Sequence, residues 1–399
     1  MACSILFLTT LNLASNPRLV KEIELAISSN FSVTVICFEF DNWSKKNNDV
    51  LINRLSLVEF ITIPAGRKPL YSWLINTLKE TLFRVISYFM SLPVHQLSQA
   101  VSRRSDMLIH ALNKAELSHI NLVVGHNTGA IYPTLFAAKK INAKVGFDVE
   151  DYHPGEGNNK KLKSLTLQLM RKTLPFFDYL SYGSESIYKE CTSKIVGLDK
   201  PTNLIINNVF SNKEFLLENS IIDDKLQLVW FSQNIDKNRG LEKIIPIVDK
   251  LSDFINLTLF GNANSNFKDL FSNYKGVIWA GSITQNNLHQ QLSRFDIGLA
   301  LEPGKDLNNE LALSNKLCAY LQAGLFVVAT DTIEQRRFIN DYIDGGLLIK
   351  KDFSDAELMF TSIIEKKDEL RSKRFQRYKI NQKISWENES VKLLEIWCN

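Results

Sequence analysis

Residues 296–331 read DIGLALEPGKDLNNELALSNKLCAYLQAGLFVVATD, and this stretch decides the fold class. The apolar runs at 297–301 and 325–329 have the length and composition of buried strands, while the apolar spacing across 313–323 is typical of a helix. Gly324 stands where such a helix would end. The stretch therefore predicts a strand, a polar loop, a helix and a second strand, which is the repeating unit of a parallel α/β sheet.

The loop that follows the first of these strands is the candidate site. Ligands bind at the carboxyl ends of strands in open parallel sheets, and a helix N-terminus at that edge favours anionic oxygens. Ser314 occupies the expected N-cap position of the helix. The charged and amide side chains of the loop and of the first helical turn are Glu302, Lys305, Asp306, Asn308, Glu310, Asn315 and Lys316.

The same alternation of strand and helix patterns covers most of the chain. It begins with strands at 4–9 and 31–38 on either side of a helix at 16–29. It continues over residues 121–206, with strands at 121–124, 144–149, near 179–181 and at 203–206. It begins again at 226–349, after a polar interruption near 207–224. Such alternation indicates parallel strands joined by crossover helices. We therefore expect two doubly wound domains whose strand-end loops face a shared cleft. The predicted domains are 1–207, 208–384 and a C-terminal helix at 385–399 that packs back toward the first domain.

Composition places the chain among soluble globular proteins. Hydrophobic residues make up 45% of the sequence and charged residues 23%, which argues against disorder. The formal net charge of +4 is too close to balance to indicate a nucleic-acid partner. The five cysteines form no CxxC pair, and the N-terminus lacks a basic segment before its apolar run. These features favour a cytoplasmic location.

The segment from Leu70 to Arg104 is the one part of the chain with a membrane-related pattern. It is helical in spacing and rich in aromatic side chains, but Lys79, Arg84 and Pro93 interrupt the run of roughly 20 apolar residues that a spanning helix needs. Two interpretations remain: a helix packed on its own sheet, or a basic amphipathic surface on the inner face of an anionic membrane. The sequence predicts no spanning segment here.

Several short motifs, in order along nearly the whole chain, carry a resemblance to a known family. The motifs are NPRLVKE (16–22), VVGHNTG (123–129), FDVED (147–151), NLIINNV (203–209), WFSQNIDKNRGLEKI (230–244), LTLFGNA (257–263), GSI (281–283) and the stretch at 296–331. Together they resemble the GT-B glycosyltransferases, most closely the retaining family 4 group, also known as the glycosyl transferases group 1 type. The resemblance implies an α/β GT-B fold of two Rossmann-like domains.

The resemblance also implies an activity. Such enzymes move a sugar, here of the hexosyl type, from a nucleotide-sugar donor in the second domain to a hydroxyl of a glycan or lipid-linked acceptor in the first. They work with retention, need no metal and no cofactor besides the donor, and build surface polysaccharides or glycolipids. Without a metal, the diphosphate leaving group must be stabilised by basic side chains and helix N-termini.

The resemblance assigns roles to particular residues. Arg239 matches the basic residue of the family's KG element and, with Lys316, is expected to bind the donor phosphates. His126 matches the histidine that the family places near the transferred sugar, and Glu310 is the expected carboxylate beside that sugar. The remaining donor-binding candidates are Glu302, Asn315 and Gly281. The polar residues Asp148, Glu150, Asp151 and His153 are interpreted as structural or acceptor-facing, so no metal site is predicted.

Two departures from the family pattern keep other functions open. Gln233 and Asn234 stand where the family has a Gly-Arg pair, and Ala319 occupies the position of its second glutamate, five residues before Gly324. These losses favour a catalytically degenerate GT-B subunit that binds a partner. A nucleotide-sugar epimerase is a further alternative within the fold, although it needs acid and base groups that the sequence does not place.

Overall fold

The chain folds into two compact units. The computed structural model describes residues 3–67, 70–217, 223–342 and 344–398. Unit 1 comprises Met1–Ile206 and Ser390–Asn399, and unit 2 comprises Asn207–Glu389. The chain therefore returns from unit 2 to unit 1 inside the last helix, after Glu389. The sequence analysis predicted this boundary at residue 385.

Unit 1 is built on a seven-stranded sheet in the order β3-β2-β1-β4-β5-β6-β7. Every strand pairing within its described residues is parallel. The chain order reverses between β1 and β4, which makes their carboxyl ends the topological switch point where ligands bind in such sheets. The strands are β1 (Ser4–Thr9), β2 (Ser32–Glu39), β3 (Val58–Pro64), β4 (Leu122–His126), β5 (Lys144–Val149), β6 (Tyr179–Tyr182) and β7 (Thr202–Ile205).

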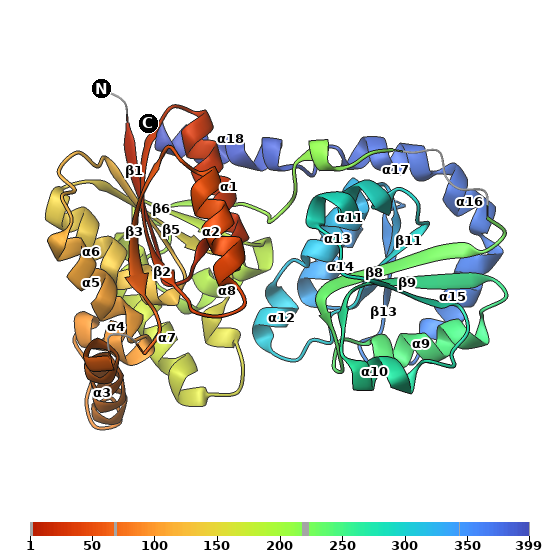
Figure 1. Cartoon of the computed structure of the whole chain (residues 1–399), viewed down its shortest axis with the longest axis horizontal. Helices are drawn as coiled ribbons and strands as arrows, with labels where there is room; N and C mark the ends of the chain where they lie inside the picture. Colours follow the sequence, from red (N-terminus) through yellow and green to blue (C-terminus); the bar gives the residue numbers. More distant parts are fainter. Residues whose placement is uncertain (1–2, 68–69, 218–222, 343, 399) are drawn as a thin grey trace. The chain divides into compact units, whose positions relative to one another are not determined.

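Helices cover both faces of this sheet (Figure 1). They are α1 (Pro17–Ser28), α2 (Lys45–Arg54), α3 (Leu70–Ile86), α4 (Val94–Val101), α5 (Arg104–Lys114), α6 (Ile131–Ile141), α7 (Lys160–Thr173) and α8 (Glu185–Lys194). The last helix, α18 (Trp386–Trp397), ends against this unit, because Trp397 donates from Nε1 to the Tyr179 hydroxyl at 2.9 Å and packs edge-on against Phe7.

Strand β3 is the one strand of unit 1 that the sequence analysis did not predict. It lies at the edge of the sheet, and only Val58 and Ile63 of its seven residues are buried. An edge strand with one partner buries fewer side chains, so its apolar signal is weak. The other strands of unit 1 lie within a few residues of their predicted positions.

Unit 2 repeats the architecture with a six-stranded parallel sheet in the order β10-β9-β8-β11-β12-β13. The strands are β8 (Leu226–Ile235), β9 (Ile255–Ala263), β10 (Val277–Gly281), β11 (Ile297–Ala300), β12 (Phe326–Thr330) and β13 (Gly346–Ile349). The helices are α9 (Leu241–Lys250), α10 (Ser265–Leu270), α11 (Gln285–Leu292), α12 (Leu307–Leu311), α13 (Asn315–Gln322), α14 (Ile333–Asn340), α15 (Ala356–Glu365), α16 (Lys367–Ser372) and α17 (Arg374–Asn381).

The central strands of unit 2 are buried on both faces. Alternate residues of β8 point to opposite sides, so Leu228 and Trp230 join one apolar cluster while Val229 joins the other. Strand β11 does the same, with Leu299 in the first cluster and Ala300 in the second. Continuous apolar runs of this kind are expected for parallel strands covered by helices on both faces.

The polar loop after β11 is more structured than the sequence predicted. Residues 307–311 form the short helix α12, which Asp306 caps by accepting a hydrogen bond from the Asn309 N–H at 2.9 Å. Helix α13 then begins at Asn315 instead of residue 313. Glu310 is therefore a helical residue and not a loop residue.

Helix α13 packs unusually close to the sheet because Gly298 of β11 has no side chain. A Cβ atom at position 298 would lie 2.1 Å from the ring of Tyr320, which is fully buried. Gly298→Ala is therefore expected to lower the free energy of unfolding of unit 2 by about 1–3 kcal/mol through overpacking. Urea unfolding tests this, with Gly66→Ala as the control because nothing lies within 4 Å of that position. Equal stability of the two variants would contradict the packing argument.

Candidate functional site

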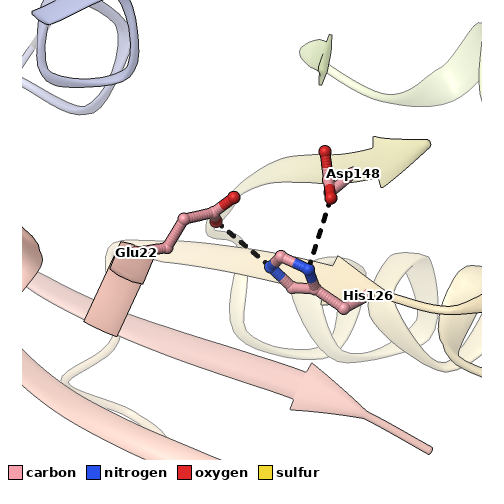
Figure 2. Close-up of side chains that lie close together, drawn as sticks. All are labelled: Glu22, His126 and Asp148. Carbon is pink, nitrogen blue, oxygen red and sulfur yellow. Dashed lines mark hydrogen bonds and ion pairs between the residues drawn. The ribbon is translucent and has the colours of Figure 1, made fainter. Parts of the chain in front are cut away.

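His126 ends β4 at the switch point of unit 1 and lies in a buried group of charged residues (Figure 2). Its Nε2 atom is 3.1 Å from the Glu22 carboxylate, and its Nδ1 atom is 3.5 Å from the Asp148 carboxylate. All three side chains are about 1% exposed. Backbone pairing fixes this arrangement, since His126 is in register with Thr9 of β1 on one side and with Asp148 of β5 on the other.

A guanidinium completes the group. Arg18 of α1 binds Asp148 with two nitrogens, Nη2 to Oδ1 and Nε to Oδ2, each at 2.7 Å. Its Nη1 atom donates to the carbonyl oxygen of Ile206 at 2.6 Å, and the Ser181 hydroxyl donates to Asp148 Oδ1 at 2.6 Å. The Nη2 contact is a hydrogen bond and the Nε contact is an ion pair without hydrogen-bond geometry, and this close pairing makes the buried charges tolerable.

Burial and neighbouring charges raise the pKa values of His126 and Glu150 in this group. Burial alone would lower the pKa of His126, but the carboxylates of Glu22, Asp148 and Glu150 outweigh it and the pKa is raised above 6.5. Burial raises the pKa of Glu150 from 4.5 to about 7, against the opposing effect of Arg18. The Nε2 atom of His126 has a hydrogen bond to Glu22, while Nδ1 lies at ion-pair distance from Asp148 without a hydrogen bond.

The arrangement of the side chains around His126 suits a protonated imidazole better than a metal ion. Glu22, His126 and Asp148 form the one group of three metal-ligating side chains found among the described residues, with ligand atoms within 4.8 Å of one another. A metal would bind one ring nitrogen, yet His126 turns a different nitrogen to each carboxylate, and Arg18 already engages both oxygens of Asp148. The contacts assign the group a positioning role at the switch point.

The stability of unit 1 is expected to fall as the pH rises, from about 4.5 to 7 through Glu150 and above 6.5 through His126. With raised pKa values, the folded state keeps a proton on His126 and on Glu150 that the unfolded state has already lost, so the folded state binds more protons. Each such proton changes the free energy of unfolding by up to about 1.4 kcal/mol per pH unit. Urea unfolding over a pH series should show a shallower decline for His126→Gln, and equal slopes would contradict the assignment.

The sequence analysis identified His126 but missed Arg18 and Glu22. Both lie on the core-facing side of α1, where the neighbouring positions are the apolar residues Leu19 and Ile23. Charged residues spaced four apart on an otherwise apolar helix face were the available signal, because buried charges are rare unless they are paired. Their common partners lie more than 100 positions away in sequence, which no local pattern predicts.

In unit 2, Glu302 is the centre of the candidate site. It follows β11, and its Oε1 atom accepts hydrogen bonds from Lys316 Nζ and from the Ser314 hydroxyl, each at 3.1 Å. Its Oε2 atom accepts from Asn309 Nδ2 at 3.1 Å. The Thr330 hydroxyl of β12 accepts a hydrogen bond from the Glu302 N–H and donates one to the Glu302 carbonyl oxygen, each at 2.7 Å. The side chain is thus held on all sides by neighbouring elements of the sheet edge.

These contacts keep Glu302 ionised. Burial raises the pKa of Glu302, but Lys316 and the hydrogen bonds from Asn309 and Ser314 outweigh it and lower the pKa below its ordinary value. The side chain of Lys316 is 14% exposed, and its Nζ atom also lies 5.8 Å from the centroid of the Trp230 ring. Lys316 is therefore held at one place at the carboxyl edge of the sheet.

The N-terminus of α13 is left without a side-chain cap. Ser314 occupies the N-cap position as predicted, but its hydroxyl donates to Glu302 and makes no cap hydrogen bond. The first N–H groups of the helix and its positive dipole end are thus available to an anion. Asn315, the first residue of α13, is exposed at this end.

Glu310 lies apart from Glu302 and has a different partner. Its Oε1 atom accepts a hydrogen bond from Lys351 Nζ at 2.6 Å. Both residues line a pocket of about 650 Å³ that is rich in charge. The other lining residues are Asp331, Ile333, Arg336, Lys350 and Asp352. Glu302 and Glu310 therefore occupy separate environments.

The remaining predicted residues lie on the surface of unit 2. Arg239 is exposed in the turn before α9, whose N-cap is Gly240 in the left-handed region with a φ of 83°. Glu242 reaches back and accepts a hydrogen bond from the Asn238 N–H at 3.0 Å, which places a carboxylate at that helix end. Gly281 ends β10, is exposed and has a φ of 77°.

Of the four polar residues at the end of β5 and just after it, Asp148 contacts His126 and His153 pairs with Glu156. His153 approaches Glu156 at 3.0 Å, and the Glu156 carboxylate raises the pKa of His153 against the effect of burial. Asp148 is the member of the four-residue cluster that contacts His126. The four residues are close together in the sequence, but the side-chain contacts of Asp148 reach Arg18 of α1 and His126 of β4.

Comparisons with known proteins show which folds this chain resembles. No protein-family model matches the chain, and neither does any curated protein. Among solved structures, Anabaena HepE in complex with UDP is 11% identical, with a TM-score of 0.68 over 98% of this chain and 99% of that one. Sucrose-phosphate synthase from Thermosynechococcus elongatus is 10% identical, with a TM-score of 0.68 over 99% of this chain and 98% of that one.

A third similar structure extends the comparison. It is a mutant of S. aureus TarM in complex with fondaparinux, alpha-GlcNAc-glycerol and UDP, which is 9% identical, with a TM-score of 0.64 over 99% of this chain and 100% of that one. These likenesses span the whole length of each chain. Together with the two parallel sheets, they confirm the predicted GT-B fold of two Rossmann-like domains.

Proposed function

We propose that the protein is a glycosyltransferase that moves a sugar from a nucleotide-sugar donor to a hydroxyl of a glycan or lipid-linked acceptor. The observation that carries the proposal is in unit 2, where the uncapped N-terminus of α13 and the ammonium group of Lys316 lie together at the carboxyl edge of the sheet. A helix N-terminus with an adjacent cation suits a diphosphate. The GT-B fold supports this interpretation.

Lys316 is the principal phosphate ligand in this proposal. The leaving nucleotide diphosphate develops negative charge as the glycosidic bond to the donor breaks, and fixed positive groups stabilise that charge. Lys316 is held in place by Glu302, while Arg239 is exposed in the turn whose Asn238 N–H bonds to Glu242. Arg239 is therefore assigned a secondary contact that forms when the donor binds.

Glu302 has two functions in the proposal. Without donor it holds Lys316 and Ser314, and with donor its ionised oxygens can accept hydrogen bonds from adjacent sugar or ribose hydroxyls. Asn315 supplies an amide at the end of α13, and Gly281 leaves the end of β10 open to the nucleotide. Unit 2 is accordingly the proposed donor-binding domain, and unit 1 the proposed acceptor-binding domain.

The proposed reaction proceeds with retention by front-face transfer. The incoming hydroxyl loses its proton to the leaving phosphate as the new glycosidic bond forms, so no protein nucleophile is needed. We assign to Glu310 a carboxylate beside the transferred sugar, and to His126 the positioning of the strand end next to that sugar. Because the His126 side chain is about 1% exposed and both ring nitrogens face carboxylates, His126 acts by holding the buried charged group in place and not as a general base.

The cellular setting follows from the same proposal. The protein is expected to be cytoplasmic, where nucleotide sugars are made, and to contribute to surface polysaccharide synthesis. A metal ion is not required, because Lys316 and α13 supply the positive charge that a metal would otherwise provide. The transferred sugar is expected to be a hexose.

Calorimetric titration with a panel of nucleotides and nucleotide sugars, without added metal, tests the proposal. Uridine nucleotides head the panel because HepE and TarM were solved with UDP. We expect one nucleotide to bind and its sugar derivative to be hydrolysed slowly in the absence of acceptor. If no nucleotide binds in the presence or absence of Mg²⁺, the proposal is wrong.

A second candidate function is a GT-B subunit that binds a donor or a partner without turnover. Ala319 in α13 favours it, because this position is fully buried and cannot supply a carboxylate. Gln233 and Asn234 favour it as well, since both lie exposed on β8 without the charge of an arginine. Nucleotide binding without hydrolysis or transfer would support this candidate.

A further inference from the structure

Helix α3 of unit 1 presents its apolar face to solvent. The large apolar side chains that are exposed here follow helical spacing for four turns and continue into the residues after the helix. They are Leu70, Tyr71, Leu74, Leu78, Leu82, Val85, Tyr88, Phe89 and Met90, and we call them the α3 surface. Monomeric soluble proteins seldom leave so many contiguous apolar residues uncovered, and such patches mark interaction sites.

The polar side of α3 faces the protein, which is the reverse of an ordinary surface helix. Lys79 Nζ donates to the Asp106 carboxylate of α5 at 2.7 Å. Arg84 Nε donates to the carbonyl oxygen of Ala100 in α4 at 2.8 Å, and its Nη2 atom pairs with Glu80. These bonds fix the rotation of the helix, so the apolar side is held outward by specific contacts.

Basic residues stand at both ends of the α3 surface. At the N-terminal end, the guanidinium groups of Arg67 and Arg103 lie 5.4 Å and 5.6 Å from the Trp73 ring. At the C-terminal end, Lys161 of α7 lies 4.0 Å from the ring of Tyr88, and Lys172 donates to the carbonyl oxygen of Leu92. Cations thus lie at both ends of the α3 surface.

The surroundings carry little compensating negative charge. Helix α7 contains five basic residues and no acidic one in the sequence KKLKSLTLQLMRKT. The acids beside α3 are already paired, Glu80 with Arg84 and Asp106 with Lys79. An apolar stripe bordered by unbalanced cations matches the interface of an anionic lipid bilayer, where acyl chains lie beneath acidic headgroups.

We propose that the α3 surface docks unit 1 on an anionic membrane, with α3 lying in the plane of the interface. Within the described part of the chain, no helix combines the length and apolar content that a bilayer crossing requires. If a second copy of the chain bound through the same face, Lys161 and Arg103 of each copy would approach basic residues of the other copy, and these like charges would repel. The charges around the α3 surface therefore favour an anionic membrane as its partner.

The structure also narrows the segment that makes the contact. The sequence analysis considered Leu70 to Arg104 as a whole, but the apolar side chains of α4 and α5, such as Leu97 and Leu108, are buried inside unit 1. Those helices lie against α3 (Figure 1, lower part of unit 1), and none of their residues is among the exposed large apolar side chains of the described chain. The docking surface is α3 with the residues up to Met90.

Co-sedimentation of the full chain with lipid vesicles tests the proposal, and it needs no enzymatic turnover. Vesicles of phosphatidylcholine alone are compared with vesicles that contain phosphatidylglycerol, at low and high ionic strength. The test variant carries Leu74→Gln, Leu78→Gln and Leu82→Gln. The matched control carries the same change at three exposed leucines outside the α3 surface, Leu57, Leu270 and Leu358. Because all six side chains are exposed, circular dichroism should show both variants folded.

The wild type and the control are expected to bind the anionic vesicles, more weakly at high salt, and the α3 variant to bind at least about 10-fold less. Binding that the α3 variant retains in full would overturn the proposal, as would no binding by the wild type. Sedimentation velocity without vesicles provides a further test. A concentration-dependent dimer that the α3 variant loses would show that a second copy covers this face, and would also overturn the proposal.

Discussion

Replacing Arg18 with methionine is expected to lower the free energy of unfolding of unit 1 by about 3–5 kcal/mol. The guanidinium is buried and binds both oxygens of Asp148, so its loss leaves the carboxylates of Asp148 and Glu22 with His126 as their remaining buried cation. An unpaired buried carboxylate is strongly unfavourable. Urea unfolding monitored by fluorescence and circular dichroism gives the change.

Arg54→Met provides the matched control for Arg18→Met. Arg54 also pairs with a glutamate, Glu24, but the two side chains are 57% and 46% exposed. Exposed ion pairs contribute about 0–1 kcal/mol, so this variant should remain close to the wild type. If Arg18→Met unfolds at the same urea concentration as Arg54→Met, the buried group does not stabilise unit 1 as argued.

Replacing Lys316 with alanine is expected to weaken donor binding roughly 30- to 900-fold, which corresponds to about 2–4 kcal/mol. Two effects add: the diphosphate loses a cation at the end of α13, and Glu302 is left as an uncompensated carboxylate beside it. Because donor binding would then bring like charges together, the loss should exceed that for Arg239→Ala. Calorimetric titration with the nucleotide that binds the wild type measures both.

Lys305→Ala is the control for Lys316→Ala, because Lys305 is an exposed lysine of the same segment, between β11 and α12. It should leave the dissociation constant within about twofold of the wild type, as expected for an exposed surface charge. A second variant, Glu302→Gln, keeps hydrogen-bonding capacity without the charge and should weaken binding less than Lys316→Ala. Equal losses for Lys305→Ala and Lys316→Ala would mean that general charge, and not the α13 site, attracts the nucleotide.

Much of the fold could be predicted from the sequence because the central strands are buried on both faces. Strands such as β1 and β5 were placed at their observed bounds, since a continuous apolar run between polar residues is a strong signal. The edge strand β3 was missed because one side of it is exposed. Helix α12 was missed because it has only five residues between polar segments, which is too short for a helical repeat of apolar residues to be recognised.

The candidate site could be predicted only in part. The positions of Glu302 and Lys316 followed from the order of strand, loop and helix, since both lie at a strand or helix end. The pairing between them, and the separate pairing of Glu310 with Lys351, depends on side-chain geometry across elements. Arg18 could not be predicted as a partner of Asp148 because 130 positions separate the two residues.

The measurement that tests the central claim most directly is sugar release from the donor panel by the purified chain without metal, with wild type and Lys316→Ala assayed together. The account predicts that the wild type releases sugar from one nucleotide sugar and that Lys316→Ala does so at a small fraction of the rate. Addition of a suitable hydroxyl acceptor should then raise the wild-type rate. Wild-type binding of a nucleotide sugar with no release or transfer under any of these conditions would contradict the claim that the protein is an enzyme.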